Sequence, residues 1–174
     1  MSRLFVAIWP PEHVREHVRE LRREDWAGVR WTPEQNWHVT LRFLGEAEPD
    51  VVAATLAAAT LPSAVVTVSS ELVILGSHSV VLPVSGVDEL AESVWAATES
   101  LGTQSMSEHF RGHLTIGRAV GRQKIVHTDS ASATKPDAGT FEVAEVALVE
   151  STLSAEGASY ATVATYPAVS GGGR

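Results

Sequence analysis

Trp37-His38-Val39-Thr40-Leu41 is one of two short stretches with the order histidine, apolar residue, threonine, apolar residue; the other is Gly112-His113-Leu114-Thr115-Ile116. Side chains of a β-strand alternate between two faces, so each histidine shares a face with its threonine. Positions two apart lie roughly 7 Å from each other, so both side chains can contact one small group. We expect two strands whose polar faces meet across a cleft.

The paired histidines suit acid–base catalysis near neutral pH, because an unperturbed pKa of about 6.5 lets imidazole both give and take a proton. Opening a five-membered cyclic phosphate requires that one proton leaves the attacking water and another reaches the departing ribose oxygen. Threonine hydroxyls can stabilise the charge on the non-bridging oxygens. We therefore expect His38 and His113 to be catalytic, with Thr40 and Thr115 binding the phosphate.

Neither stretch offers the ligands of a metal site. Residues 36–45 and 110–117 contain no Asp or Glu, and the chain contains no cysteine. Divalent cations such as Mg²⁺ prefer carboxylate oxygens, and structural zinc sites commonly use thiolates. His13 and His17 have the i,i+4 spacing of helical metal ligands, but no third ligand is evident, so we interpret them as a solvated face. The sequence predicts chemistry without a metal or another cofactor.

Composition limits the classes of partner. The chain has 174 residues, 44% of them apolar, enough for one domain; we expect this domain to span 1–169, before a flexible tail at 170–174. The formal net charge of -8 disfavours a general nucleic-acid coat protein but allows one positive pocket. No stretch reaches the roughly 18 apolar residues of a membrane span, so we expect a cytoplasmic protein. The sequence indicates no oligomeric state.

Hydrophobic periodicity predicts an α+β protein. Runs rich in Val and Ile predict strands at 4–9, 37–45, 64–69, 72–75, 79–84, 113–117, 140–151 and 159–166. Amphipathic stretches predict helices at 11–24 and 48–61, and a third helix that begins within 85–88 and ends at Gly102. Residues 121–139 are expected to be mainly a loop. A strand, a helix and a His-x-Thr strand recur in this order, which indicates two similar lobes with a cleft between them.

The chain resembles the two-histidine phosphoesterases, and within them the bacterial and archaeal RNA 2',3'-cyclic phosphodiesterases once described as 2'-5' RNA ligases. The resemblance extends over nearly the whole chain. It runs through RLFVA at 3–7, VRW at 29–31, PEQNWHVTLRFLGE at 33–46, FRGHLTIGR at 110–118 and ESTLSAEGASY at 150–160. It implies two antiparallel sheets lining a central cleft with helices on the outside. It also implies metal-free hydrolysis of 2',3'-cyclic phosphates, on RNA ends or nucleosides, to 2'-phosphates.

Carried over residue by residue, the resemblance makes His38 the proton donor to the leaving 3' oxygen. His113 becomes the base that activates water, and Thr40 and Thr115 bind the phosphate. The residues alone leave the two histidines nearly equivalent. The family commonly has proline directly before the second motif histidine; this chain has Gly112, which is expected to leave the entry to the strand less constrained.

Two arginines are further candidates for phosphate binding. Alternation places Arg42 on the face of His38 and Thr40, where it could bind phosphate or merely edge the sheet. Strict alternation places Arg118 away from His113 unless the strand bends at Gly117, whereas the resemblance favours a role for Arg118 in the site.

Three aromatic residues could contact a base or sugar: Trp31, Phe110 and Tyr160. Core packing is the alternative explanation for each of them. Two other functions also stay open at this point. One is a non-catalytic module that binds nucleotides or RNA ends on the same fold; the other is a phosphodiesterase for a small cyclic phosphate or a 2'-linked substrate.

Overall fold

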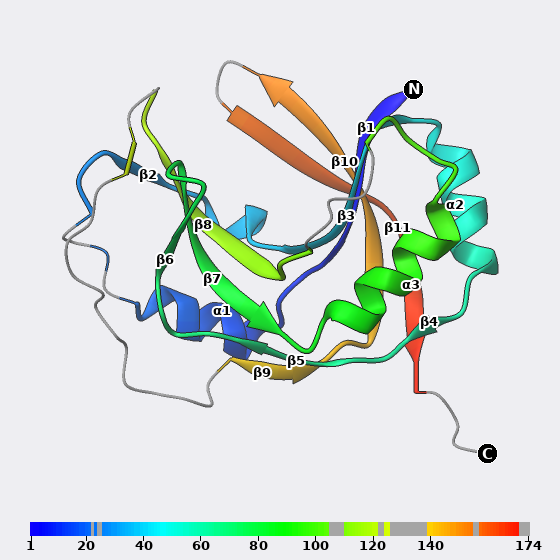
Figure 1. Cartoon of the computed structure of the whole chain (residues 1–174), viewed down its shortest axis with the longest axis horizontal. Coiled ribbons are helices and arrows are strands. Elements are labelled where there is room, and N and C mark those ends of the chain that lie inside the picture. Colours follow the sequence, from blue (N-terminus) through cyan, green and yellow to red (C-terminus); the bar gives the residue numbers. More distant parts are fainter. Residues whose placement is uncertain are drawn as a thin grey trace.

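The computed structural model describes residues 1–21, 23, 26–104, 110–121, 124–125, 139–154 and 157–170. Within these residues the chain forms one continuous sheet with three α-helices against it (Figure 1). The predicted α+β class is confirmed. Most of the expected loop 121–139, and residues 171–174 of the expected tail, lie outside the described residues. In the described part of the chain, no helix is long and apolar enough to cross a membrane.

The sheet has eleven strands, and the order along its main path is β4-β11-β10-β1-β3-β8-β7-β5-β9. Strand β2 pairs with β8, and β6 pairs with β7. All pairs are antiparallel except β4 with β11. The bounds are β1 Ser2–Ile8, β2 Val29–Trp31, β3 Val39–Ala47, β4 Leu61–Pro62, β5 Val65–Val68, β6 Val73–Leu75, β7 Ser79–Ser85, β8 His113–Ala119, β9 Thr140–Glu142, β10 Glu145–Ser154 and β11 Gly157–Val169.

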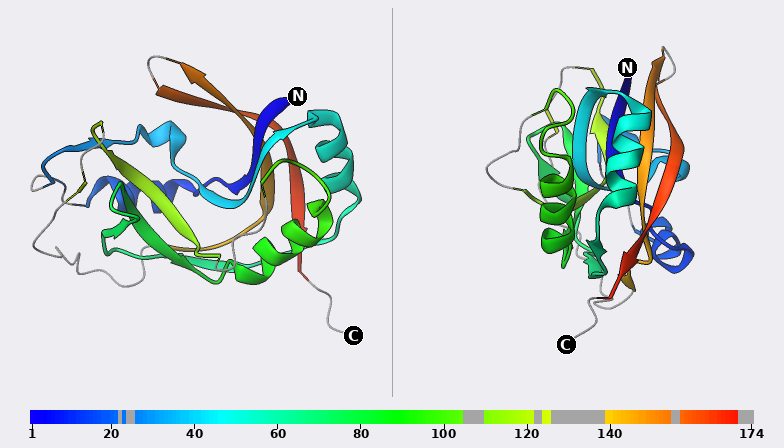
Figure 2. Two further views of the ribbon diagram at one scale, coloured as in Figure 1. Left: turned by 45° about the horizontal axis from the view of Figure 1, so that its top comes forward. Right: turned by 90° about the vertical axis from the view of Figure 1, so that its right-hand side faces the viewer.

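The two His-x-Thr strands lie side by side at the centre of this order, where the sheet is weakest. Strands β3 and β8 share the single register pair Val39–Leu114. Beyond this pair the two halves of the sheet diverge, and the β10–β11 hairpin rises above the rest of the fold (Figures 1 and 2). The two expected lobes are therefore one sheet that opens at the junction of the two motifs.

The helices cover the outside of the two halves: α1 is Glu12–Arg19, α2 is Pro49–Ala58 and α3 is Asp88–Thr98. His17 of α1 is buried and hydrogen-bonds Ser70 before β6, so the expectation that it lies on a solvated face is wrong. Helices α2 and α3 pack against each other, and α3 also contacts β3. Helix α2 ends at Ala58 and does not reach Leu61. Pro62 disfavours helical backbone at the residue before it, which is Leu61.

Two clusters of buried side chains lie on opposite faces of the central strands. The larger cluster fills the space between the sheet and the helices, and it includes Val39 and Leu114 of the two motifs. The smaller one contains Phe5, Ala7, Ala147 and Val149, with Trp9, Phe43 and Tyr160 packed against it. Figure 1 shows that β1, which carries Phe5 and Ala7, runs beside β3 and β10. The smaller cluster therefore supports the cleft side of β3.

Candidate active site

A β-bulge in β3 changes which residues face the cleft. Thr40 pairs with Ala7 and Arg42 pairs with Val6, so Leu41 is an extra residue between them. After the bulge, Phe43 packs against the smaller cluster, and Leu44 is buried in the larger one. Simple alternation therefore holds for His38 and Thr40 but fails at Arg42.

Arg42 is 1% exposed, and its guanidinium hydrogen-bonds groups at the C-terminal end of α3. It donates hydrogen bonds to the carbonyls of Trp95 (3.2 Å) and Leu101 (2.8 Å) and to the Thr98 hydroxyl, and it lies 4.0 Å from the Trp95 ring centroid. Carbonyls at a helix C-terminus lack intrahelical partners, and arginine commonly supplies them. These hydrogen bonds already use the guanidinium that the sequence predicts to contact phosphate, although Arg42 also lines the pocket that includes Thr40 and His113.

A second bulge, in β8, has the opposite effect on Arg118. Thr115 pairs with Val81 and Gly117 pairs with Val80, so Ile116 is the extra residue. Ile116 and Gly117 are both buried, and Arg118 is exposed. The strand therefore bends next to Gly117, as considered from the sequence, and Arg118 lies on the same face as His113 and Thr115.

The two motif histidines are held in the same way. His38 Nδ1 lies 2.7 Å from the carbonyl oxygen of Asn36, and His113 Nδ1 lies 2.7 Å from that of Arg111. A carbonyl oxygen can only accept a hydrogen bond, so Nδ1 must carry a proton in both rings. Each Nε2 is then free to take up or release a proton. The same local geometry therefore fixes the same neutral tautomer in both rings.

Aromatic rings surround His38. Its ring centroid lies 4.8 Å from Phe5, 5.7 Å from Trp9 and 5.1 Å from Tyr160. The pKa of His38 is lowered to about 4, chiefly by burial among these rings; the Asn36 carbonyl opposes this shift, and the positive charges of Arg118 and His113 add to it. His38, His113 and Arg118 are therefore close enough to influence one another electrostatically.

This low pKa predicts an unusual titration. In an NMR titration of the histidine rings, we expect one resonance, absent from His38→Ala, to remain that of a neutral ring well below pH 6.5. The unfolded chain takes up a proton on His38 near pH 6.5, but the folded chain does so only near pH 4. Stability from this residue is therefore complete above pH 6.5 and lost as the pH falls towards 4. Protonation of His38 at pH 6.5 in the free protein would contradict this prediction.

Asn36 is the last residue of a short 3₁₀ helix, Glu34–Asn36, which places its carbonyl beside His38. The Asn36 side chain donates a 3.1 Å hydrogen bond to the carbonyl of Ala158 in β11. Arg15 and Arg19 of α1 both bind the Glu34 carboxylate. The carbonyl that orients His38 is therefore fixed from two sides. The sequence showed no role for Asn36, because the orienting group belongs to the backbone.

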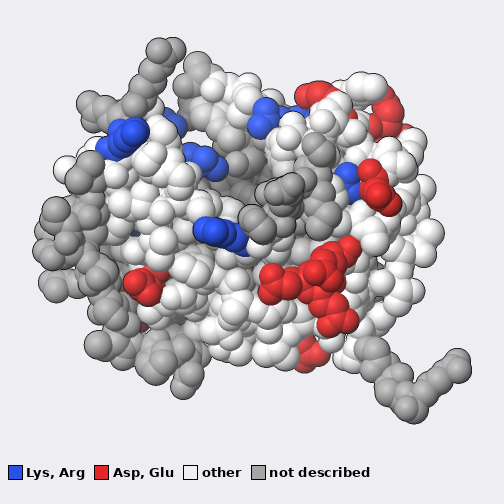
Figure 3. All heavy atoms as spheres, viewed as in Figure 1, with Lys and Arg blue, Asp and Glu red and all other residues white. Residues whose placement is uncertain are grey.

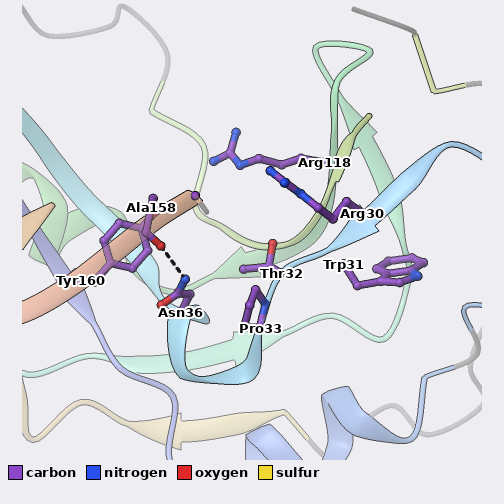
Figure 4. A pocket seen from close by; sticks show the side chains of 9 residues that line it. Arg30, Trp31, Thr32, Pro33, Asn36, Arg118, Ala158 and Tyr160 are labelled. Atoms are coloured by element: carbon purple, nitrogen blue, oxygen red, sulfur yellow. Dashed lines mark hydrogen bonds between the residues drawn. The ribbon is translucent and has the colours of Figure 1, made fainter. Parts of the chain in front are cut away.

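Two pockets flank the histidines. One, of about 340 Å³, is lined mainly by apolar groups and includes Thr40, Phe43, Trp95, Phe110 and His113, together with Arg42 and Arg111; we call it the apolar pocket. The other, of about 180 Å³, includes Arg30, Thr32, Asn36, Arg118, Ala158 and Tyr160; we call it the arginine pocket (Figure 4). Phe110 and Tyr160 thus line pockets, as a contact to base or sugar requires.

Trp31 does not fit the expected contact to a base. Figure 4 shows its ring turned away from the other residues of the arginine pocket. The ring packs 6.4 Å from that of Trp26 in an edge-to-face arrangement, and Arg23 lies over it. Arg30 and Thr32, its two neighbours, point to the pocket by the alternation of β2. The Trp31 ring therefore packs as a core residue does, although Trp31 is among the residues that line the pocket. Arg30 lines the same pocket, and the sequence did not single it out.

Gly112 leaves no room for a side chain before His113. A Cβ atom at this position would lie 2.6 Å from the Val84 carbonyl oxygen and 2.6 Å from Val87 Cγ1. The Gly112 carbonyl also accepts a hydrogen bond from the Val84 amide. The expectation that glycine leaves this entry less constrained is therefore wrong, because close packing against β7 replaces the rigidity of proline.

We expect Gly112→Ala to lower the free energy of unfolding by about 1–3 kcal/mol, because the new methyl group overlaps backbone and Val87. Urea unfolding measures this loss. Val87→Ala should relieve part of the overlap, so the double variant should lose less than the two single variants together. Unchanged stability in Gly112→Ala would show that the strands do not approach each other this closely.

Among the described residues, no three or more His, Asp or Glu side chains are grouped closely enough to hold a metal ion. Figure 3 shows Lys and Arg side chains around a hollow in this face, with the acidic side chains mostly to the right and below. The site can therefore offer two imidazoles, two threonine hydroxyls and arginine charge to an anionic ligand. An α+β fold that opens between two His-x-Thr strands is the arrangement that the resemblance to two-histidine phosphoesterases implies.

Comparison with known proteins finds relatives and solved structures of this phosphoesterase type. Residues 8–70 match the model of the family described as LigT like phosphoesterase. A protein named RNA 2',3'-cyclic phosphodiesterase from Methanocaldococcus jannaschii is 25% identical over 92% of this chain and 98% of its own length. One of the same name from Archaeoglobus fulgidus is 28% identical over 91% and 96%. The crystal structure of E. coli LigT complexed with 3'-AMP superposes with a TM-score of 0.75 and 22% identity, over 96% of this chain and 98% of that one. These matches support assignment of the chain to the LigT-like two-histidine phosphoesterases.

Proposed function

We propose that this protein hydrolyses 2',3'-cyclic phosphates at the ends of RNA or on nucleotides to 2'-phosphates, without a metal. The observation that carries this proposal is the matched pair of histidines, each with Nδ1 bound to the carbonyl two residues earlier and Nε2 free. The names of the two archaeal relatives support this substrate class. The 3'-AMP in the E. coli LigT crystal supports binding of a nucleotide phosphate.

In the proposed reaction, His113 Nε2 takes a proton from water as the water oxygen attacks phosphorus. The bond from phosphorus to the ribose 3' oxygen breaks, and His38 Nε2 gives its proton to that oxygen. Thr40 and Thr115, one on each motif strand, donate hydrogen bonds to the non-bridging oxygens. The phosphate remains on the 2' oxygen, and the two histidines exchange protonation states, which solvent then restores.

The low pKa of His38 places a condition on this assignment. A proton donor must be protonated when substrate is bound, yet His38 is neutral at pH 7 in the free protein. An anionic phosphate beside the ring favours the imidazolium form, because opposite charges raise the pKa of histidine. We therefore expect 2'-AMP to move the His38 titration towards neutral pH in the same NMR experiment. No movement would assign the donor role to His113 instead.

The pH profile of kcat/KM tests the proposal as acid–base chemistry. We expect a bell-shaped profile in the presence of a chelator, with limbs that belong to the coupled histidine pair. A flat profile across neutral pH would contradict paired proton transfer. Tight binding of 2'-AMP without turnover of any cyclic phosphate would instead identify a binding module on the same fold.

A further inference from the structure

Arg30 and Arg118 form a pair that the proposed chemistry does not use. They lie directly opposite each other on the antiparallel strands β2 and β8. Both line the arginine pocket, and Figure 4 shows both guanidinium groups directed to the same side of it, above Thr32. Their strands pair only over Val29–Trp31, so the two charges are brought together by the short strand β2.

Two like charges directly opposite each other destabilise a pair of strands. Within the described residues, neither Arg30 nor Arg118 forms a salt bridge, whereas Arg15 and Arg19 both bind Glu34. Among the residues that the structure describes, no acidic side chain lines the arginine pocket, although the chain carries a net charge of -8. Its described lining therefore concentrates positive charge from Arg30 and Arg118, which suits an anionic group of a ligand.

The arginine pocket adjoins the proposed catalytic centre on the His38 side. Asn36 and Tyr160 line it; the Asn36 carbonyl holds His38, and the Tyr160 ring lies 5.1 Å from the His38 ring. The apolar pocket includes His113 and Thr40. The two pockets thus lie on different sides of the histidine pair. Arg30 and Arg118 line one of them, whereas the other is mainly apolar, although Arg42 and Arg111 are among its lining residues.

The stereochemistry of ribose matches this arrangement. In a 2',3'-cyclic phosphate, the base is attached next to C2', and the 5' carbon lies beyond C3'. A cyclic phosphate held between the histidines, with its 3' oxygen towards His38, therefore directs the base to the apolar pocket. The 5' position is directed to the arginine pocket, where the next phosphate of a nucleotide chain is attached.

We propose that Arg30 and Arg118 bind a second phosphate of the substrate, the one attached to its 5' oxygen. This inference rests on the proposed function and specifies the substrate class. The preferred substrates carry a phosphate on both sides of the terminal ribose, either as an internucleotide diester or as a 5'-terminal monoester. Nucleoside 2',3'-cyclic phosphates without a second phosphate lack this contact.

The first test compares kcat/KM for adenosine 2',3'-cyclic phosphate, its 5'-phosphorylated form and a dinucleotide with a cyclic phosphate end. We expect kcat/KM to be at least tenfold higher for a substrate with the second phosphate. The 5'-phosphorylated nucleoside tests a monoester in this position, and the dinucleotide tests a diester. Arg30→Gln should remove this advantage and leave the one-phosphate substrate within about twofold. Lys124→Gln removes the same charge from a side chain that does not line the pocket, and it should retain the advantage. An equal rate for all three substrates, or an advantage that survives in Arg30→Gln, would overturn the inference.

The second test does not depend on turnover. Calorimetry should show that adenosine 2',5'-bisphosphate binds at least tenfold more tightly than 2'-AMP to the wild-type protein, and equally tightly to Arg30→Gln. Equal affinity of the wild-type protein for both ligands would overturn the second-phosphate site. If the bisphosphate is preferred but no cyclic phosphate is hydrolysed, the site stands and the proposed reaction fails.

Discussion

His38→Ala and His113→Ala should each lower kcat/KM for a 2',3'-cyclic phosphate by at least 10²- to 10⁴-fold, the range that general acid–base groups supply. Each variant lacks one of the two proton transfers, and the remaining histidine cannot take both roles in one turnover. The double variant should lose little more than the worse single variant, because the two groups act as a unit. Steady-state kinetics with a chelator present measures these losses.

His78→Ala is the matched control for both variants. His78 Nδ1 lies 2.8 Å from the carbonyl oxygen of Gly76, the same local geometry as in the motifs, but the residue is exposed and lines neither pocket. Its activity should remain within about twofold of the wild-type value. Wild-type turnover in folded His38→Ala or His113→Ala would refute the catalytic pair, and circular dichroism establishes that each variant is folded.

Arg42→Met should have the largest effect on stability, a loss of about 3 kcal/mol, with nearly unchanged KM. Methionine keeps the apolar packing of the arginine stem, but it leaves the carbonyls of Trp95 and Leu101 without their donor. Each buried polar group without a partner costs about 1–3 kcal/mol. The free energy of unfolding in urea tests this expectation.

Arg3→Met provides the comparison, because Arg3 also lies over an aromatic ring, 4.8 Å from the Phe43 centroid, but is exposed. Its stability should change by no more than about 0.5 kcal/mol. If Arg42→Met were as stable as wild type and its KM rose tenfold or more, Arg42 would be a phosphate ligand after all.

The two arginines show what the sequence pattern can and cannot predict. Alternation over two positions correctly placed each histidine with its threonine, because no irregularity interrupts so short a segment. It failed for Arg42 because the bulge at Leu41 shifts the side chains that directly follow it to the other face. The bulge in β8 could be expected from the sequence, because a glycine within a strand, here Gly117, often marks a β-bulge. Leu41 carries no comparable signal.

The sequence pattern could not predict contacts made by backbone groups or contacts that depend on the pairing of distant strands. Asn36 acts through its carbonyl, which every residue has, so no residue type marks it. Arg30 becomes part of a site only when β2 pairs with β8, about ninety residues later in the chain. Helix α1 ends at Arg19, earlier than the predicted 24, although the apolar spacing of Val14, Val18 and Leu21 continues beyond it.

The central claim is that His38 and His113 together open a cyclic phosphate towards the 2' product. The most direct test incubates the wild-type protein with an oligonucleotide that ends in a 2',3'-cyclic phosphate, in the presence of a chelator, and separates 2'- from 3'-phosphate products. The account predicts complete conversion to the 2'-phosphate at the rate measured without the chelator. A 3'-phosphate product, or a reaction that stops when metal is removed, would contradict it.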